Sequence, residues 1–143
     1  QDSKEWENIM PLLRTTVLDE IGHITIKYIA KVIDAPSFVL FKGQFGRLQV
    51  WGRSESETDL DPHEMTVAEW TYANGEVAGA GTQTLSNINV FFMPMKALEE
   101  TVGIIGIQYD FKGLLLDQRR LLGAISNVSA LAVARWASAA SHI

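Results

Sequence analysis

The sequence predicts an α+β domain built on an antiparallel sheet, with helical segments at both ends of the chain. Two strand-like runs flank residues 43–46, and two more flank residues 98–100, which is the spacing of tight hairpins. Tight hairpins join antiparallel neighbours. The order helix, hairpin, helix, hairpin, helix therefore favours an α+β fold over the strand–helix alternation of a parallel sheet.

The chain opens with a predicted helix over residues 6–34. Apolar residues recur there at spacings of three and four, which marks one helical face: Val17, Leu18, Ile21, Ile24, Tyr28, Ile29 and Val32. Pro11 is expected to start or kink the segment, and Pro36 to end it, because the residue before a proline avoids the α conformation. We expect one domain over residues 1–143, with 1–36 as its leading helical segment and 37–143 as sheet and C-terminal helix.

The middle of the chain predicts a hairpin and a short helix. Residues 37–42 and 47–52 are rich in aromatic and branched residues and should form the hairpin strands. The polar run 53–61 reads as a solvated loop. Pro62 suits a first helical position, and Asn74–Gly75 suits the left-handed conformation of a helix C-terminus.

Two further strands and a long helix complete the predicted fold. The strands are residues 90–96 and 101–109, and Pro94 must lie at an edge, an end or a bulge because it has no N–H to donate. Asp117 is the expected N-cap of a helix over residues 118–139.

The final helix has two different sides. One side carries an apolar stripe that should pack on the sheet: Leu121, Leu122, Ile125, Val128, Ala132 and Trp136. The other side is small and weakly apolar, and we expect it to meet a partner helix in a homodimer: Ala124, Asn127, Ala130, Leu131 and Ala134, next to Gly123. The alternative is that alanine is simply the best helix former.

Composition excludes several classes of protein. The net charge of −5 and the pI near 5.1 argue against nucleic acid as a partner. The absence of cysteine excludes disulfides, thiolate metal sites, cysteine nucleophiles and cysteine-linked chromophores. No apolar run approaches the ~20 residues that cross a bilayer, so no membrane contact is expected. Because the chain begins with Gln1 and carries no signal-like segment, it is expected to be a piece of a longer polypeptide or a processed chain.

The strongest candidate site is the loop that follows the short helix. It combines three glycines with two threonines, and with two tryptophans it is predicted to line a pocket for a small anionic or nucleotide-like ligand: Trp51, Trp70, Gly79, Gly81, Thr82 and Thr84. The competing interpretation is a tightly packed connector beside core tryptophans. The loop lacks the Gly-Lys-Ser/Thr ending of a phosphate-binding P-loop.

No catalytic or metal-binding constellation accompanies this loop. The chain has no Gly-x-Ser-x-Gly elbow, so no serine is activated in that way. Asp59, Asp61, His63 and Glu64 read as a solvated loop and first-turn charges rather than as a metal site. We therefore predict a binding or sensing module without metal or cofactor, and not an enzyme.

Two groups of residues carry a family resemblance. The runs Met93-Pro94-Met95 and Val102-Gly103-Ile104-Ile105-Gly106-Ile107, with the closing helix, resemble a GAF domain. More narrowly, residues 67–136 resemble the GAF region of KdpD-type sensor histidine kinases, through Trp70, Gly75, Ala78-Gly79, Gly81-Thr82 and Thr84-Leu85.

This resemblance implies a regulatory role. It implies a cytoplasmic domain of an integral inner-membrane kinase that controls potassium-uptake genes through a response regulator. The ATP-dependent kinase part and its phosphoacceptor histidine would lie outside this chain, and the C-terminal helix would relay the signal. The alternatives are a stand-alone nucleotide-binding GAF protein and a ligand-free structural or dimerisation spacer.

Overall fold

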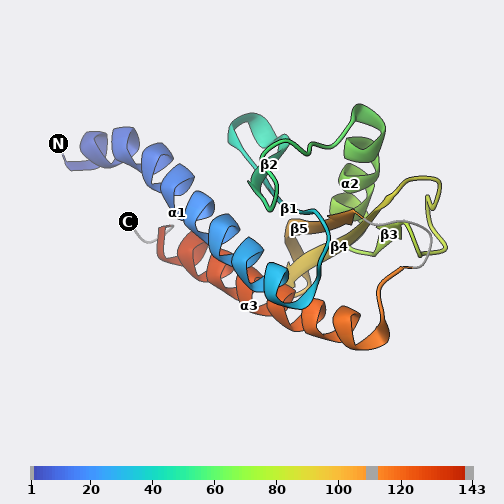
Figure 1. The fold of residues 1–143 in the computed structure, drawn as a ribbon. Helices are drawn as coiled ribbons and strands as arrows, with labels where there is room; N and C mark the ends of the chain where they lie inside the picture. Colours follow the sequence, from blue (N-terminus) through green and yellow to red (C-terminus); the bar gives the residue numbers. More distant parts are fainter. Residues whose placement is uncertain (1, 109–112, 141–143) are drawn as a thin grey trace.

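The computed structural model describes residues 2–108 and 113–140, and it confirms the predicted α+β class (Figure 1). Five strands form one sheet in the order β2-β1-β5-β4-β3, and every neighbouring pair is antiparallel. The strands are β1 Ser37–Lys42, β2 Leu48–Arg53, β3 Ala78–Gly79, β4 Val90–Ala97 and β5 Glu100–Gln108. The helices are α1 Asp2–Val32, α2 Pro62–Asn74, α3 Leu116–Ala140 and the short 3-10 turn η1 Gln44–Gly46.

The sheet is buried on both faces. Successive side chains of a strand point to opposite faces, and β1 shows this directly: Val39 and Phe41 pack with α1 and α3, whereas Phe38 and Leu40 pack under α2. The two terminal helices thus share one face, as predicted, and α2 covers part of the other (Figure 1).

The helix α1 runs unbroken through Pro11, so the expectation that Pro11 starts a segment is wrong. Leu18 and Ile29 of the predicted apolar face are buried against the sheet. Ile24 and Tyr28 are not, with 46% and 55% of their surface exposed. They lie on the side of α1 that turns away from the sheet, because a face of seven residues is wider than the strip the sheet can cover.

Backbones approach closely where α1 crosses the edge strand β2. A Cβ on Gly52 would lie 2.8 Å from the carbonyl oxygen of Gly22, and a Cβ on Gly22 would lie 3.1 Å from that of Trp51. Trp51 is an extra residue in the strand, since Val39 pairs with Gly52 and the next residue, Leu40, pairs with Val50. Such a bulge re-aims a side chain, and here the Trp51 indole donates a hydrogen bond to the Phe41 carbonyl oxygen at 3.2 Å.

The ends of α2 follow the sequence prediction. Asp61 accepts from the Glu64 amide at 2.7 Å, and the Glu64 carboxylate accepts from the Asp61 amide at 2.9 Å, which is a capping box. Gly75 closes the helix with a φ of 65° and donates to the Thr71 carbonyl oxygen. These contacts account for Asp61 and Glu64 without a metal, and the described part of the chain holds no cluster of three or more acidic or histidine side chains suited to one.

Pro94 lies where β4 has a neighbour on one side only. The strand β3 pairs with Phe91 and Phe92 and then ends, so Pro94 faces β5 across from Ile104 and leaves its other side open. The register shifts directly after it, between Met95 and Lys96. The edge or bulge position expected for Pro94 is therefore confirmed.

The helix α3 begins at Leu116 rather than Gln118. The Gln118 side chain accepts a hydrogen bond from the Leu115 amide at 3.0 Å, and Asp117 lies inside the first turn, so the expectation of an Asp117 N-cap is wrong. Residues 116–139 are long and apolar enough to cross a bilayer, contrary to our expectation that no such run exists. This result rests on the length and composition of the helix, and core helices of soluble proteins meet the same two criteria. In the structure α3 packs against α1 and β4.

Candidate functional site

The glycine–threonine loop folds back on itself. Gly79 donates to the Thr84 carbonyl oxygen at 2.8 Å, and Ala80 donates to that of Val90 at 2.9 Å. Gly79 has a φ of 94°, and a Cβ there would collide with the Val90 carbonyl oxygen. Only glycine fits this position, since it combines positive φ with a close backbone contact.

The Thr82 hydroxyl is used inside the loop. It lies 2.8 Å from the carbonyl oxygens of both Gly79 and Thr84, and it accepts from the Thr84 amide at 3.1 Å. A hydroxyl has one proton and two lone pairs, so these contacts take up its donor and leave little capacity for a ligand. This geometry favours the connector interpretation for Thr82 over the predicted ligand contact.

An open depression of about 530 Å³ nevertheless lies beside the loop. It brings three of the predicted ligand residues together with an arginine from α3, and its lining is Glu76, Val77, Gly81, Thr82, Gln83, Thr84 and Arg119. The Arg119 guanidinium lies 5.2 Å from the ring centre of Phe91, within cation–π range. Arg119 was not among the residues predicted for this site.

The two tryptophans lie apart from each other. Trp51 packs with the core on the α1–α3 face, whereas Trp70 packs with the core under α2, on the opposite face of the sheet. Gly79 is buried within β3. The predicted single pocket of Trp51, Trp70, Gly79, Gly81, Thr82 and Thr84 is therefore wrong as a set, because strand alternation and the position of α2 place the tryptophans on different faces.

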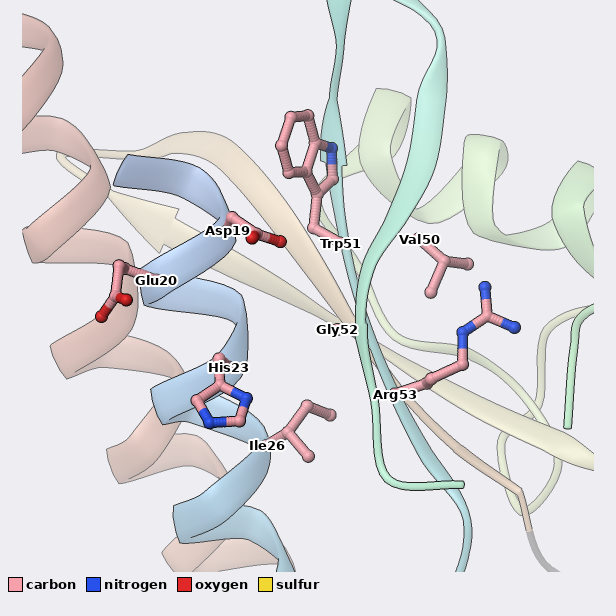
Figure 2. Close-up of a pocket in the computed structure, with 8 residues that line it drawn as sticks. All are labelled: Asp19, Glu20, His23, Ile26, Val50, Trp51, Gly52 and Arg53. Atoms are coloured by element: carbon pink, nitrogen blue, oxygen red, sulfur yellow. The ribbon is translucent and has the colours of Figure 1, made fainter. Parts of the chain in front are cut away.

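A second cleft, of about 320 Å³, lies between α1 and β2 (Figure 2). Figure 2 shows Asp19 directed toward β2, Glu20 directed away from it, and the Arg53 guanidinium leaving the strand on the side away from α1. Arg53 is engaged elsewhere, by Asp59 at 3.4 Å and by the Thr58 carbonyl oxygen at 3.0 Å. The charged groups of this cleft do not converge on one point.

An apolar groove of about 380 Å³ runs between α1 and α3 on the side away from the sheet. Its lining is Ile21, Ile24, Thr25, Tyr28, Ala124, Ile125, Val128, Ser129 and Ala132. Two hydroxyls form its floor: Thr25 donates to the Ile21 carbonyl oxygen at 2.6 Å, so the proton between Thr25 and Ser129, 2.7 Å apart, comes from Ser129. Both side chains are buried.

The outward side of α3 differs from the predicted one. Ala130 is completely buried and is not free to meet a partner, and Ala134 is half-buried against the same core. Ala124, Asn127 and Leu131 are exposed as predicted, but Val128 and Leu121, which were assigned to the sheet side, are 70% and 51% exposed. The helix packs on the core through Leu122 and Ala130, which are both completely buried, with Ser126 buried on the same side.

One titratable group in the structured core is perturbed. Burial raises the pKa of Tyr72 above its ordinary value of 10.0, Arg14 opposes that shift, and the carboxylates of Glu100 and Glu69 add to it. The ring also lies 4.5 Å from the Lys42 ammonium. Tyr72 lines none of the three hollows described above.

Comparison with known proteins agrees with the fold. The profile of the GAF domain family matches residues 17–135. Sensor protein KdpD of Escherichia coli is 30% identical over 125 residues, and that of Clostridium acetobutylicum is 23% identical over 130 residues. These alignments cover 86% and 87% of this chain but 14% of each relative, so the chain spans about one-seventh of their length.

Solved structures give the same result. The native GAF domain of the potassium sensor histidine kinase KdpD from Escherichia coli superposes with a TM-score of 0.73 and 26% identity, over 94% of this chain and 98% of that one. The GAF domain of an Acinetobacter phosphoenolpyruvate-protein phosphotransferase shares the fold, with a TM-score of 0.62 and 10% identity over 90% and 95% of the two chains. The fold, the matched profile and the KdpD relatives together show that this chain belongs to the GAF domain family, and that it is homologous to the GAF domain of KdpD.

Proposed function

We propose that this chain is the regulatory GAF domain of a KdpD-type sensor histidine kinase, and that α3 relays its conformational state to the rest of the kinase. The homology to the KdpD GAF domain carries this proposal. The parent protein would be an integral inner-membrane kinase that controls potassium-uptake genes through a response regulator, with this domain in the cytoplasm. Catalysis would reside in the kinase part, outside this chain.

The arrangement of the terminal helices supports a relay. The helices α1 and α3 run antiparallel, and the first residues of α1 and the last residues of α3 lie at the same end of the molecule (Figure 1). A displacement of α3 against α1 would therefore change the spacing of both chain ends. A signal shifts such an equilibrium only by as much as its affinity differs between the two arrangements.

A homodimer through the terminal helices would couple two such domains. The groove between α1 and α3 is apolar, and its rim exposes Ile24, Tyr28 and Val128 by 46%, 55% and 70%. A two-fold interface uses the same patch on both subunits, and this groove flanked by protruding side chains is suited to pairing with a copy of itself. The chain therefore offers a continuous apolar seam, which is rarely left exposed in a monomer.

Sedimentation of paired variants tests the dimer. Ile24→Glu combined with Val128→Glu should shift the chain to monomer, because two charges would enter the seam. Leu115→Glu is the matched control: it also replaces an exposed apolar residue, 70% exposed, but lies outside the groove. A monomeric wild type at high concentration, or equal effects of both substitutions, would contradict the dimer.

A domain exchange tests the regulatory role. The GAF domain of Escherichia coli KdpD is replaced by this chain, and reporter expression is measured across external potassium concentrations. A response that depends on potassium supports the proposal, and a chimera with constant output, although stable and membrane-inserted, contradicts it.

A ligand-free spacer is a second candidate, and one observation favours it. The loop predicted to bind a ligand satisfies the Thr82 hydroxyl internally. For a spacer, calorimetry against nucleotides, cyclic dinucleotides and potassium would give no heat beyond dilution.

A further inference from the structure

Arg119 occupies an unfavourable position for a cation. It lies in the first turn of α3, where the helix dipole places partial positive charge. Among the side chains that the structure describes, the one ion pair shorter than 4.0 Å joins Arg53 to Asp59, so Arg119 forms no ion pair with any of them. Instead the guanidinium is held 5.2 Å from the Phe91 ring.

Arg119 lines the depression beside the glycine loop. The loop's internal hydrogen bonds use the amides of Gly79, Ala80, Thr82 and Thr84. Gly81 and Gln83 also line the depression, and their amides have no acceptor in the described part of the chain. Arg119, which forms no ion pair with the described side chains, thus lines the same hollow of about 530 Å³ as two residues with unused N–H donors.

We infer that this depression binds a small oxyanion, the phosphate or carboxylate group of a metabolite, with Arg119 as its principal contact. A guanidinium presents two parallel N–H donors that match two oxygens of either group. The ring of Phe91 holds the side chain near its bound position, so less rotamer freedom is lost on binding. The site goes beyond the proposed kinase role and does not depend on it.

Glu76 limits which anions fit. Its exposed carboxylate lines the same depression and repels a second negative charge. The site should therefore prefer a ligand with one anionic group and a hydroxyl or amine near Glu76. Replacing Glu76 with glutamine keeps the shape and removes the repulsion, so it should tighten the binding of simple anions.

Titration of the 143-residue chain tests this site. Inorganic phosphate and acetate are titrated separately at constant ionic strength, with sodium chloride as background, and followed by calorimetry and by amide NMR shifts. Binding should move the amide signals of Gly81 and Gln83. Arg119→Gln should weaken binding at least tenfold, and Glu76→Gln should strengthen it about threefold.

Arg120 provides the matched control. It is the neighbouring arginine, it is exposed, and it does not line the depression. Arg120→Gln removes the same net charge and should change binding less than twofold. Binding of phosphate alone would assign a phosphoryl group, and binding of acetate alone a carboxylate. No binding of either anion to the wild type, or equal weakening by both arginine variants, would overturn the inference.

Discussion

At the scale of single residues, the β4–β5 turn carries side chains that its backbone disfavours. Leu98 and Glu99 have φ angles of 52° and 71°, both in the left-handed region, and Leu98 is 90% exposed. A two-residue hairpin with both φ angles positive is the type I′ geometry, which asparagine and glycine prefer. The turn was predicted from its position between two strand-like runs, whereas its handedness was not, because neither residue signals it.

Replacing the turn by Leu98→Asn with Glu99→Gly should therefore stabilise the chain, by about 1 kcal/mol, because the left-handed strain is relieved. Urea denaturation measures the change. The control is Leu115→Asn, which also removes an exposed leucine but has no positive φ to relieve. An unchanged or lowered midpoint for the turn variant would show that the strain is absent.

Tyr72 predicts a dependence of stability on pH in the alkaline range. Because burial raises its pKa in the folded chain, the unfolded chain loses the phenolic proton first. The contribution of the protonated Tyr72 side chain to the unfolding free energy is fully present below pH 10, and it is lost as the pH rises through 10 and above. Tyr72→Phe removes the titrating group, so its unfolding free energy should fall less steeply between pH 9 and about 11 than that of the wild type. If the unfolding free energies of Tyr72→Phe and the wild type fell in parallel over this pH range, the raised pKa of Tyr72 would be refuted.

The two glycines at the α1–β2 crossing give another pair of single-residue expectations. Gly52→Ala should destabilise the chain by about 2 kcal/mol or more, because the added methyl meets the Gly22 backbone and cannot be accommodated by a side-chain rotation. Gly123→Ala is the opposite case. Nothing lies within 4 Å of a Cβ there, and alanine favours the helix by up to about 1 kcal/mol. In thermal unfolding, the midpoint temperature should fall for Gly52→Ala and rise for Gly123→Ala.

At the scale of elements, helix existence followed from the sequence more reliably than helix orientation. The 3-and-4 spacing located α1 and α3 correctly, and the capping residues located α2. The rotation of α3 was predicted only in part: Leu122 and Ile125 pack on the core as predicted, but Leu121 and Val128 are exposed, because a helix rich in alanine and serine offers two similar faces. The structure places Ser126 and Ala130 against the sheet, with Ser126 donating to the Pro94 carbonyl oxygen at 3.2 Å, and turns Val128 outward.

The hydroxyl pair between α1 and α3 should couple the two helices energetically. Thr25→Val alone leaves the buried Ser129 hydroxyl without its acceptor and should cost about 1–2 kcal/mol, whereas Ser129→Ala leaves Thr25 bonded to the Ile21 carbonyl oxygen and should cost less. The double variant should cost clearly less than the sum, since both polar groups are then gone. A double-mutant cycle from denaturation curves measures this coupling. Strictly additive effects of the two substitutions would show that the hydroxyl pair does not couple α1 to α3.

At the scale of the whole molecule, the antiparallel sheet and the placement of the terminal helices on one face were predictable. Hairpin spacing dictates antiparallel pairing, and the apolar faces of both terminal helices need the same sheet. The binding loop was only partly predictable. Its glycines indicated the turn, but the sequence did not show that Trp51 packs on the α1–α3 face of the sheet while Trp70 lies on α2, which covers the other face. The contribution of Arg119 arises from a contact across 28 residues of sequence, which no local pattern encodes.

Cysteine crosslinking tests the proposed assembly with a contrast internal to α3. Ala132 lines the outward groove and is exposed, whereas Ala130 is completely buried. In oxidising conditions Ala132→Cys should form a disulfide-linked dimer, and Ala130→Cys should remain monomeric on a denaturing gel. Efficient crosslinking through position 130 would require α3 to leave the sheet.

The start of α1 and the end of α3 lie at the same end of the molecule, which has a practical consequence (Figure 1). A polypeptide that enters through α1 and leaves through α3 returns to the end at which it entered, so the unit can be inserted between two consecutive helices of a host. Removing it and bridging the gap with a short glycine–serine tether should accordingly leave the remainder of such a host able to fold.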